Sequence, residues 1–251
     1  MMGSVILTVE QKPELKYVNI ENGDQNLTVI IAAAGHSRRM GTDKILMNIL
    51  GEEVILHTLR VFQNCDVVSD IIVVANEDNI CDIQKICTDN NISKLTDVVL
   101  GGKERIDSVV NGIEKCYTPF VAIHDGARPL VKNEDIIRVF EAAKEYGGAI
   151  AGAPVKNTIK IINEDKMEVS TPIRSLLFEA HTPQIFNTML YKCALQKAVQ
   201  DASVVYTDDA MIFTKAGYTV KMVDTGYENI KITTAEDALL AQQLLLRRMG
   251  K

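Results

Sequence analysis

The stretch from Val29 to Lys44, VIIAAAGHSRRMGTDK, is the most informative part of this chain. An apolar run typical of a buried β-strand ends in small residues and at Gly35. Arg38, Arg39 and Lys44 follow in the same loop. The backbone of such a loop can come close to a ligand, and its cations can meet negative charge. The pattern suits a nucleoside triphosphate, whose base and sugar need space and whose phosphates need cations.

Two common phosphate-binding loops do not match this stretch. A Walker A loop needs adjacent Gly and Lys before Ser or Thr, whereas Gly41 and Lys44 are not adjacent here. A dinucleotide fingerprint needs G-x-G-x-x-G, but the second residue after Gly35 is Ser37. The pattern that remains is A-A-G-x-x-R-R-M-G-x-x-K. The alternative interpretation is a basic surface loop after a buried strand.

The composition is that of an ordinary globular protein. The chain has 251 residues, of which 47% are hydrophobic and 24% charged, enough for one large α/β domain or two small ones. The net charge of −6 argues against non-specific nucleic-acid binding, but local cations could still attract an anionic substrate. No apolar run approaches the roughly 18 residues of a membrane span. We expect no nucleic-acid or membrane partner.

The five cysteines are odd in number, and their spacing fits neither a zinc site nor a thioredoxin motif. They favour reduced thiols and a cytoplasmic location. Residues 1–26 form an N-terminal extension to which the sequence assigns no function. Within it, VILTV at 5–9 could add an edge strand.

Apolar, β-rich runs alternate with amphipathic helical segments along the chain. This alternation predicts an α/β fold with a doubly wound, mostly parallel sheet. Ligands of such sheets bind beyond the carboxyl ends of the strands. Gly35, the Gly101-Gly102 pair and the 124–126 segment all follow predicted strands, so three loops should meet at one edge. We expect strands at 28–33, 70–75, 96–100, 119–124 and 148–152, and helices near 54–64, 77–88, 104–116 and 133–146.

The pattern changes between Val155 and Thr171, where two extended segments flank a polar turn at 163–165. We interpret residues 155–175 as a β-hairpin arm that projects from the sheet. An isolated hairpin is marginal in water, so a second subunit is a natural partner for it. No internal repeat or linker appears, and we expect residues 27–251 to form a single domain. Its last part should contain helices near 187–199, 208–216 and 234–249 and a strand at 218–223.

Two further segments carry residues suited to nucleotide chemistry. In LGGKERIDSV at 100–109, the glycines allow close backbone approach, and Ser108 can hydrogen-bond a base or a ribose. An ordinary turn before a helix is the alternative. In VAIHDGARPLV at 121–131, Asp125 could ligate a Mg²⁺ ion that bridges triphosphate oxygens, and Arg128 would add a cation. A structural Asp–Arg pair is the competing interpretation, and we interpret His124 as a packed strand residue.

Three residues farther along complete the set. Thr182 lies in HTPQIF, where Pro183 favours an extended conformation of the residue before it. Lys231 lies in ENIKITTAED, just before a helix with a capping box at its start. Arg174 lies at the end of the arm. Taken singly, Arg and Lys are most often surface residues, and the functional interpretation depends on their joint presence.

Together these segments resemble the 2-C-methyl-D-erythritol 4-phosphate cytidylyltransferase family, from about residue 28 to 247. The resemblance rests on seven segments in the same order: AAAGHSRRMG…K at 33–44, GGKERIDSV at 101–109, HDGARP at 124–129, APVKNTIK at 153–160, TPQIF at 182–186, TDDA at 207–210 and NIKIT at 229–233. It implies a Rossmann-like nucleotidyltransferase that joins CTP to 2-C-methyl-D-erythritol 4-phosphate and releases pyrophosphate, in non-mevalonate isoprenoid biosynthesis, with Mg²⁺ as cofactor.

The resemblance also implies residue roles. The catalytic residues would be Arg39, Lys44, Arg174 and Lys231. The nucleotide would be bound by Ala33, Ala34, Gly35, Ser37, Gly102, Arg105, Ser108, Asp125 and Gly126. The polyol phosphate would be bound by Arg128, Thr158, Thr182 and Thr207, and the metal by Asp125. In the family, Thr158 and Arg174 serve the neighbouring subunit's site, which implies a homodimer with active sites at the subunit interface.

The chain departs from the family pattern in its first loop. The family commonly has glycine at the position of Ser37 and proline just before its catalytic lysine, whereas Asp43 precedes Lys44 here and the loop is shorter by about two residues. An aspartate at this place could partly neutralise the lysine. Two other functions stay open: a ribitol 5-phosphate cytidylyltransferase, and a non-catalytic nucleotide-binding regulator. The AAAG segment and Arg174 favour methylerythritol phosphate over ribitol phosphate.

Overall fold

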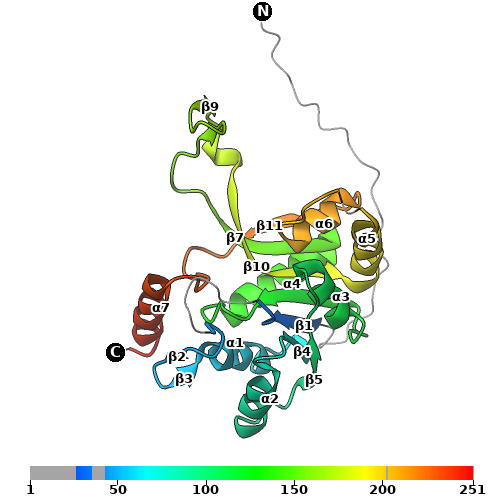
Figure 1. The fold of residues 1–251 in the computed structure, drawn as a ribbon, viewed down its shortest axis with the longest axis vertical. Coiled ribbons are helices and arrows are strands. Elements are labelled where there is room, and N and C mark those ends of the chain that lie inside the picture. The colour runs from blue at the N-terminus through cyan, green and yellow to red at the C-terminus, as the bar shows by residue number, and fades with distance from the viewer. Residues whose placement is uncertain (1–26, 36–42, 202, 251) are drawn as a thin grey trace, which may run out of the picture.

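A computed structural model describes residues 27–35, 43–201 and 203–250 of the chain. Seven strands form one sheet in the order β11-β7-β10-β6-β1-β4-β5 (Figure 1). Neighbouring strands are parallel except at β10, which runs antiparallel to both β7 and β6. The strands are β1 Leu27–Ala32, β4 Val68–Ala75, β5 Leu95–Leu100, β6 Phe120–Asp125, β7 Gly148–Pro154, β10 Phe178–Asn187 and β11 Lys221–Asp224.

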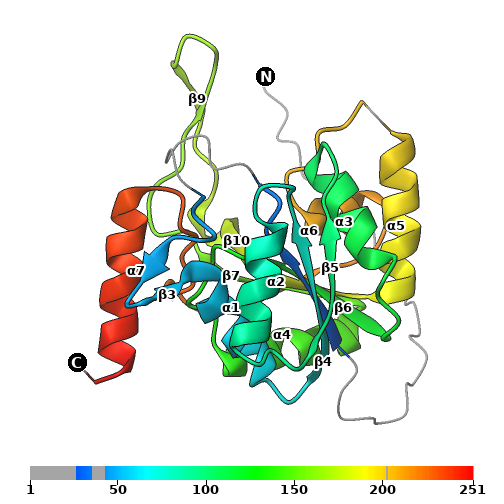
Figure 2. The ribbon, with the colours of Figure 1, turned by 60° about the horizontal axis from the view of Figure 1, so that its bottom comes forward.

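Helices cover both faces of this sheet (Figure 2). Residues of α1, α2, α4 and α7 belong to one buried apolar cluster, and residues of α3, α5 and α6 belong to a second. The alternation of strand side chains explains the division, since Val29 and Ile31 join the first cluster and Ile30 the second. The helices are α1 Val54–Gln63, α2 Ile80–Asp89, α3 Arg105–Ile113, α4 Asn133–Tyr146, α5 Thr188–Gln200, α6 Asp209–Lys215 and α7 Ala235–Arg248.

The fold class predicted from the sequence is confirmed, but one central strand was not predicted. The ten residues of β10 lie between β7 and β6. Their sequence lacks the usual apolar pattern of a buried strand, because His181, Thr182 and Gln184 are polar and Pro183 interrupts the run. All three polar side chains are buried. Thr182 and Gln184 make hydrogen bonds with other segments, and that tertiary context holds the strand.

Backbone hydrogen bonds tie together the loops at the carboxyl edge of the sheet. The amide of Ala33 donates to the carbonyl of Val74 at 2.8 Å, and that of Gly101 to Ala75 at 2.8 Å. The amide of Gly126 donates to the carbonyl of Ala32 at 3.0 Å. These bonds extend the parallel pairing beyond the regular strands. The ends of β1, β4, β5 and β6 are thereby fixed relative to one another.

A hairpin projects from the end of β7 and returns through β10 (Figure 1). It pairs β8, Ile161–Ile162, with β9, Glu168–Ser170, in antiparallel register, and a single 3-10 turn, Arg174–Leu176, follows. We call residues 155–177 the arm. A second, short hairpin joins β2, Asn48–Ile49, to β3, Glu52–Glu53. The strand considered for residues 5–9 lies outside the described residues.

Candidate active site

A pocket of about 360 Å³ opens at the carboxyl edge of the sheet. Small residues that follow β1 form one wall, and the loop and first turns of α3 form another. Lys44, Asp125 and Lys231 bring charge to it. The lining residues are Ile30, Ala32, Ala33, Ala34, Gly35, Lys44, Ile45, Val74, Gly102, Lys103, Glu104, Arg105, Ser108, Val109, Asp125, Ala127 and Lys231.

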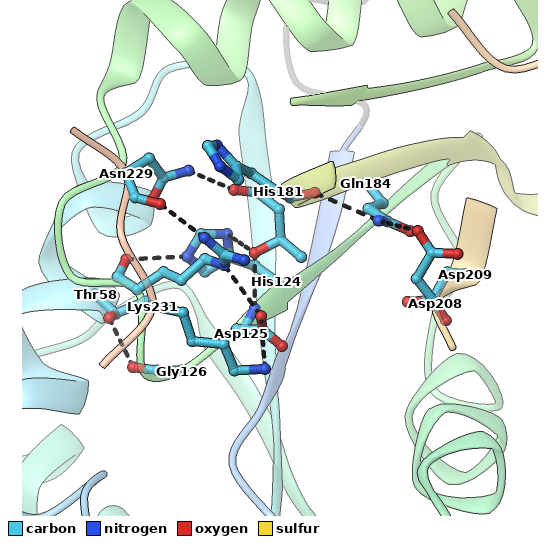
Figure 3. A network of polar contacts seen from close by, with 12 residues as sticks. Thr58, His124, Asp125, Gly126, His181, Gln184, Asp208, Asp209, Asn229 and Lys231 are labelled. Atoms are coloured by element: carbon cyan, nitrogen blue, oxygen red, sulfur yellow. Dashed lines mark hydrogen bonds and ion pairs between the residues drawn. The ribbon is translucent and has the colours of Figure 1, made fainter. Parts of the chain in front are cut away.

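Asp125, the last residue of β6, is the anionic centre of this pocket. Its Oδ2 lies 3.1 Å from Nζ of Lys231 and accepts a hydrogen bond from Nε of Arg128 at 3.1 Å. Figure 3 shows Asp125 and Lys231 pointing toward one another. Burial by itself would raise the pKa of Asp125, but Lys231 and Arg128 outweigh it and hold the pKa well below its usual range. The carboxylate is therefore charged at neutral pH.

Arg128 is fixed by two partners and is largely buried. Its Nε donates to Asp125, and its Nη1 donates to the backbone carbonyl of Asn229 at 2.7 Å. The Asn229 side chain donates to the carbonyl of Thr182 at 2.7 Å. Asn229 therefore joins the segment that carries Lys231 to β10. Its own Oδ1 is buried without a hydrogen-bond partner.

His124 precedes Asp125 on β6 and is fully buried. Its Nδ1 lies 3.1 Å from the Thr182 hydroxyl, and its Nε2 lies 3.2 Å from the carbonyl oxygen of Arg128. The Thr182 hydroxyl also accepts a hydrogen bond from the amide of Asp125 at 3.1 Å. Burial, the largest effect, lowers the pKa of His124 to about 3. The imidazole is neutral at physiological pH and acts in a hydrogen-bond network.

The loop before α3 is closed by its own hydrogen bonds. The Ser108 hydroxyl accepts from the amide of Gly102 and donates to the carbonyl of Glu104, both at 3.1 Å. A Cβ atom at Gly102 would lie 2.2 Å from the Cβ of Asp107. Glycine at this position is therefore required by the close packing of the loop on α3.

Arg105, in the first turn of α3, pairs with the fully buried Asp209 at the start of α6. Burial alone would lower the pKa of Arg105, but Asp209 outweighs it and raises that pKa. The Tyr191 hydroxyl also donates to Asp209. Nearby, the Gln184 amide donates to Asp208 at 2.9 Å. Figure 3 places Gln184, Asp208 and Asp209 to one side of the cluster around Asp125.

Asp43, which directly precedes Lys44, is held by two side-chain hydrogen bonds. Its Oδ1 accepts from the amide of Ile45 at 3.0 Å, and its Oδ2 from the side chain of Asn79 at 2.8 Å. Asn79 is itself buried and donates to the carbonyl of Ala33 at 3.1 Å. Asn79 thus connects Asp43 to the end of β1.

Many of the sequence-predicted residues meet at the pocket. Its walls include Ala33, Ala34, Gly35, Lys44, Gly102, Arg105, Ser108, Asp125 and Lys231. Arg128 and Thr182 lie directly behind Asp125, bonded to it. Ser37 and Arg39 lie outside the described residues.

Besides Arg128 and Thr182, four other predicted residues do not line this pocket. Gly126 is buried, and its carbonyl accepts a hydrogen bond from Thr58 at 2.9 Å. Thr158 and Arg174 are exposed on the arm, where Arg174 donates to the carbonyl of Lys156 at 3.1 Å. Thr207 is exposed just before α6.

The structure adds five residues that sequence reasoning had not selected. Asp208 and Asp209 lie in the TDDA segment, Gln184 in TPQIF and Asn229 in NIKIT, so those matched segments carried a signal for them. Asn79 lies in no matched segment. Only the fold reveals its contacts with Asp43 and Ala33.

The comparisons with known proteins agree with this geometry. Residues 27–247 match the family described as 2-C-methyl-D-erythritol 4-phosphate cytidylyltransferase. A protein of that name from Alkaliphilus metalliredigens is 41% identical, over 88% of this chain and 94% of its own length. One from Dehalococcoides mccartyi is 39% identical, over 88% of this chain and 97% of its own.

Among solved structures, the 4-diphosphocytidyl-2C-methyl-D-erythritol synthase of Anaerococcus prevotii superposes with a TM-score of 0.79 at 28% identity. The match covers 89% of this chain and 97% of that one. Sequence and fold thus agree along nearly the whole described chain. Since the family match spans residues 27–247, this chain belongs to the 2-C-methyl-D-erythritol 4-phosphate cytidylyltransferase family.

Proposed function

We propose that this protein transfers a cytidylyl group from CTP to 2-C-methyl-D-erythritol 4-phosphate, giving the CDP-polyol and pyrophosphate. The observation that carries this proposal is the pocket itself. Small residues at the end of β1 leave room for a nucleoside, and Lys44 and Lys231 face the space beside Asp125. Family membership supplies the substrates, which the relatives' names state for those proteins.

The chemical problem is electrostatic, because a phosphate anion must attack the α-phosphate of another anion. Two unit charges 4 Å apart interact by about 4 kcal/mol at an effective dielectric of 20. Lys44 and Lys231 would offset this repulsion and stabilise the departing pyrophosphate. Arg39, outside the described residues, would add a third cation. The phosphate is already a nucleophile, so no general base is required.

Asp125 is suited to contribute to a Mg²⁺ site. Within the described residues no group of three or more His, Cys, Asp or Glu side chains could hold a metal alone. Mg²⁺ is usually held by one or two carboxylates together with substrate phosphates and water. Lys231 and Arg128 make their closest contacts with Oδ2 of Asp125. The other carboxylate oxygen, Oδ1, would then bind the Mg²⁺ ion. When bound, the ion would neutralise phosphate charge.

The arm supports a homodimer in which each active site uses residues of both copies. Several large apolar side chains of the arm are exposed, among them Val169 at 64% and Leu176 at 79%. Arg174 and Thr158 lie on the same arm, away from their own chain's pocket. A second copy would cover the apolar surface and receive these two polar side chains.

We place the reaction in the cytoplasm, where CTP is made and thiols stay reduced. The structure has no disulfide among its five cysteines. Among the described residues, no helix has the length and apolar character needed to span a membrane.

A pyrophosphate-release assay tests the activity. It compares CTP with the other three nucleoside triphosphates, and methylerythritol phosphate with ribitol 5-phosphate. We expect release with CTP and methylerythritol phosphate in the presence of Mg²⁺, and a CDP-polyol by mass spectrometry. Release with ribitol 5-phosphate alone would assign the other polyol. CTP binding without release would indicate a non-catalytic nucleotide-binding protein.

A further inference from the structure

The segment that follows β11 is bonded to the root of the arm. β11 pairs with β7, and Figure 1 shows it beside the place where the arm begins. The amide of Thr225 donates to the carbonyl of Gly152 at 2.8 Å. The Tyr227 hydroxyl donates to the carbonyl of Pro154, the last residue of β7, at 3.0 Å. Tyr227 is therefore bonded to the residue directly before the arm.

The same tyrosine makes a second contact, with the arm itself. Nζ of Lys156 lies 3.3 Å from the centroid of the Tyr227 ring, which is the geometry of a cation–π interaction. The backbone carbonyl of Lys156 accepts a hydrogen bond from Nη1 of Arg174 at 3.1 Å. Lys156 thus connects Tyr227 to Arg174, the arm residue assigned above to the active site of a second copy.

The arm's own hydrogen bonds do not fix its direction. Its strands β8 and β9 are two and three residues long, and a small hairpin is marginal in water by itself. Within the described residues, the hydrogen bonds of the arm join arm residues to one another, as that from the amide of Val155 to the carbonyl of Leu177 does. The direction of the arm therefore depends on β7, on β10 and on the contacts of Tyr227 at its root.

We propose that Tyr227 is a positioning residue, which holds the arm and Arg174 in the direction that completes the active site of a second copy of this chain. The inference rests on the proposed function for the dimer and for the role of Arg174. Tyr227 is close in sequence to Lys231, which lines the pocket of its own chain, yet its contacts are with the arm. An arm that is already held in place needs less ordering when it enters the shared site.

Substitutions on both sides of the stack test this role. Tyr227→Leu removes the hydroxyl and the ring, and we expect it to lower kcat/KM for methylerythritol phosphate about tenfold, the effect of one hydrogen bond and one exposed cation–π interaction together. The KM for CTP should not change. Tyr227→Phe keeps the ring and should cost only about threefold.

Lys156→Met removes the ammonium group and keeps the carbonyl that Arg174 uses, so it should also cost about threefold. Added to Tyr227→Leu it should cost nothing more, because both changes remove the same interaction. A further threefold loss in the double variant would mean that Lys156 and Tyr227 act independently and would overturn the proposal.

Tyr146→Leu is the matched control. Nζ of Lys221 lies 5.3 Å from the centroid of the Tyr146 ring, so this variant also removes a tyrosine that is paired with a lysine. Lys221 pairs with Ala149 near the start of β7, at the opposite end of that strand from the arm. We expect wild-type kinetics. An equal loss in Tyr146→Leu and Tyr227→Leu would mean that the arm is not the cause and would overturn the proposal.

Mixed dimers, isolated with two different affinity tags, decide on which copy Tyr227 acts. Paired with a Lys231→Met subunit, a Tyr227→Leu subunit leaves one site with an intact pocket and an intact arm, so about half of the wild-type activity should remain. Paired with an Arg174→Ala subunit, both arms are defective, and about a twentieth should remain. If Tyr227 served its own pocket, the two activities would be reversed. Equal or reversed activities would overturn the proposal.

The hold on the arm can also be measured without any turnover. The amide hydrogens of Val155 and Leu177 are hydrogen-bonded at the root of the arm, and their exchange with solvent, followed by NMR, reports local opening. We expect exchange about tenfold faster in Tyr227→Leu than in the wild type or Tyr146→Leu. Unchanged exchange would overturn the inference. Absence of turnover in the wild type would reject the proposed function alone, and this measurement would still decide whether Tyr227 holds the arm.

Discussion

At the scale of single residues, we expect a substitution of Lys231 to reduce catalysis without reducing the stability of the fold. Its side chain is 39% exposed, and exposed ion pairs contribute only about 0–1 kcal/mol. We expect Lys231→Met to leave the melting temperature nearly unchanged and to lower kcat about 10²–10³-fold, as loss of a transition-state charge partner does. Lys132→Met is the control, because Lys132 is similarly exposed and pairs with Glu228 at 3.0 Å away from the pocket. Equal activity losses in the two variants would contradict the assignment.

A substitution of Asp125 should, in contrast, reduce the stability of the fold. The side chain of Arg128 is only 10% exposed, and it would lose its carboxylate partner. Breaking a buried pair from one side costs about 3–5 kcal/mol. We expect a loss of that size in the free energy of unfolding of Asp125→Asn, measured by urea titration at pH 7. The control is Asp135→Asn, which breaks a pair of the same spacing whose arginine is 53% exposed. If both variants lose the same stability, burial of Arg128 is not the cause.

The same pair predicts how stability depends on pH. The pKa of Asp125 is lower in the folded state than the unfolded value of about 3.9. The unfolded chain therefore takes up this proton first as the pH falls. The contribution of ionised Asp125 to the free energy of unfolding is complete above about pH 5 and is progressively lost below about pH 4. Urea titrations from pH 7 downward should give a constant difference between wild type and Asp125→Asn until that range. A difference that closes near pH 6 would contradict the assigned shift.

At the scale of elements, the sequence predicted the segments whose own pattern determines their structure. The apolar runs of β1, β4 and β6 and the amphipathic helices α1 and α4 lie within two residues of their predicted ends. Thr234 and Asp237 form the expected capping box of α7. In β10 the buried Thr182 and Gln184 are polar and depend on partners far away in sequence. Local pattern cannot predict such a strand, because its stability comes from tertiary contacts.

The candidate site also contains residues that the sequence could predict and contacts that it could not. Residues that act through their position after a strand, such as Gly35 and Asp125, could be predicted from sequence because the edge of a parallel sheet gathers them. The ion pair of Arg105 with Asp209 joins two segments that no spacing rule connects. The hydrogen bond between Asp43 and Asn79 is also of this kind.

The arm gives a prediction of its own at this scale. Val169 lies on β9 and is 64% exposed, so a charge placed there would be tolerated in a monomer and buried in a dimer. We expect Val169→Asp to weaken self-association about tenfold or more, as loss of a central apolar contact does. Sedimentation velocity would measure it. Met189→Asp is the control, since Met189 is 75% exposed on α5. An unchanged mass distribution for Val169→Asp would contradict the proposed role of the arm.

At the scale of the whole molecule, the arm and the pocket belong to different parts of the chain. Arg174 is exposed on the arm, while Lys231 lines the pocket beside Asp125. If a complete site needs the pocket of one copy and the arm of the other, single defects in the two places must complement each other. Such complementation distinguishes a shared site from two independent sites in the same dimer.

We expect an equal mixture of Arg174→Ala and Lys231→Met subunits, unfolded and refolded together, to recover activity that neither variant has alone. Random pairing puts both types in roughly half of the dimers, and each mixed dimer holds one intact site, so about a quarter of wild-type activity should return. Pyrophosphate release would be measured on the mixture, and also on mixed dimers isolated with two different affinity tags, which should have about half of the wild-type activity. The control is a refolded mixture of Arg174→Ala with Arg174→Ala, which should stay inactive. Verified mixed dimers without activity would mean that Arg174 and Lys231 of the same chain must act together.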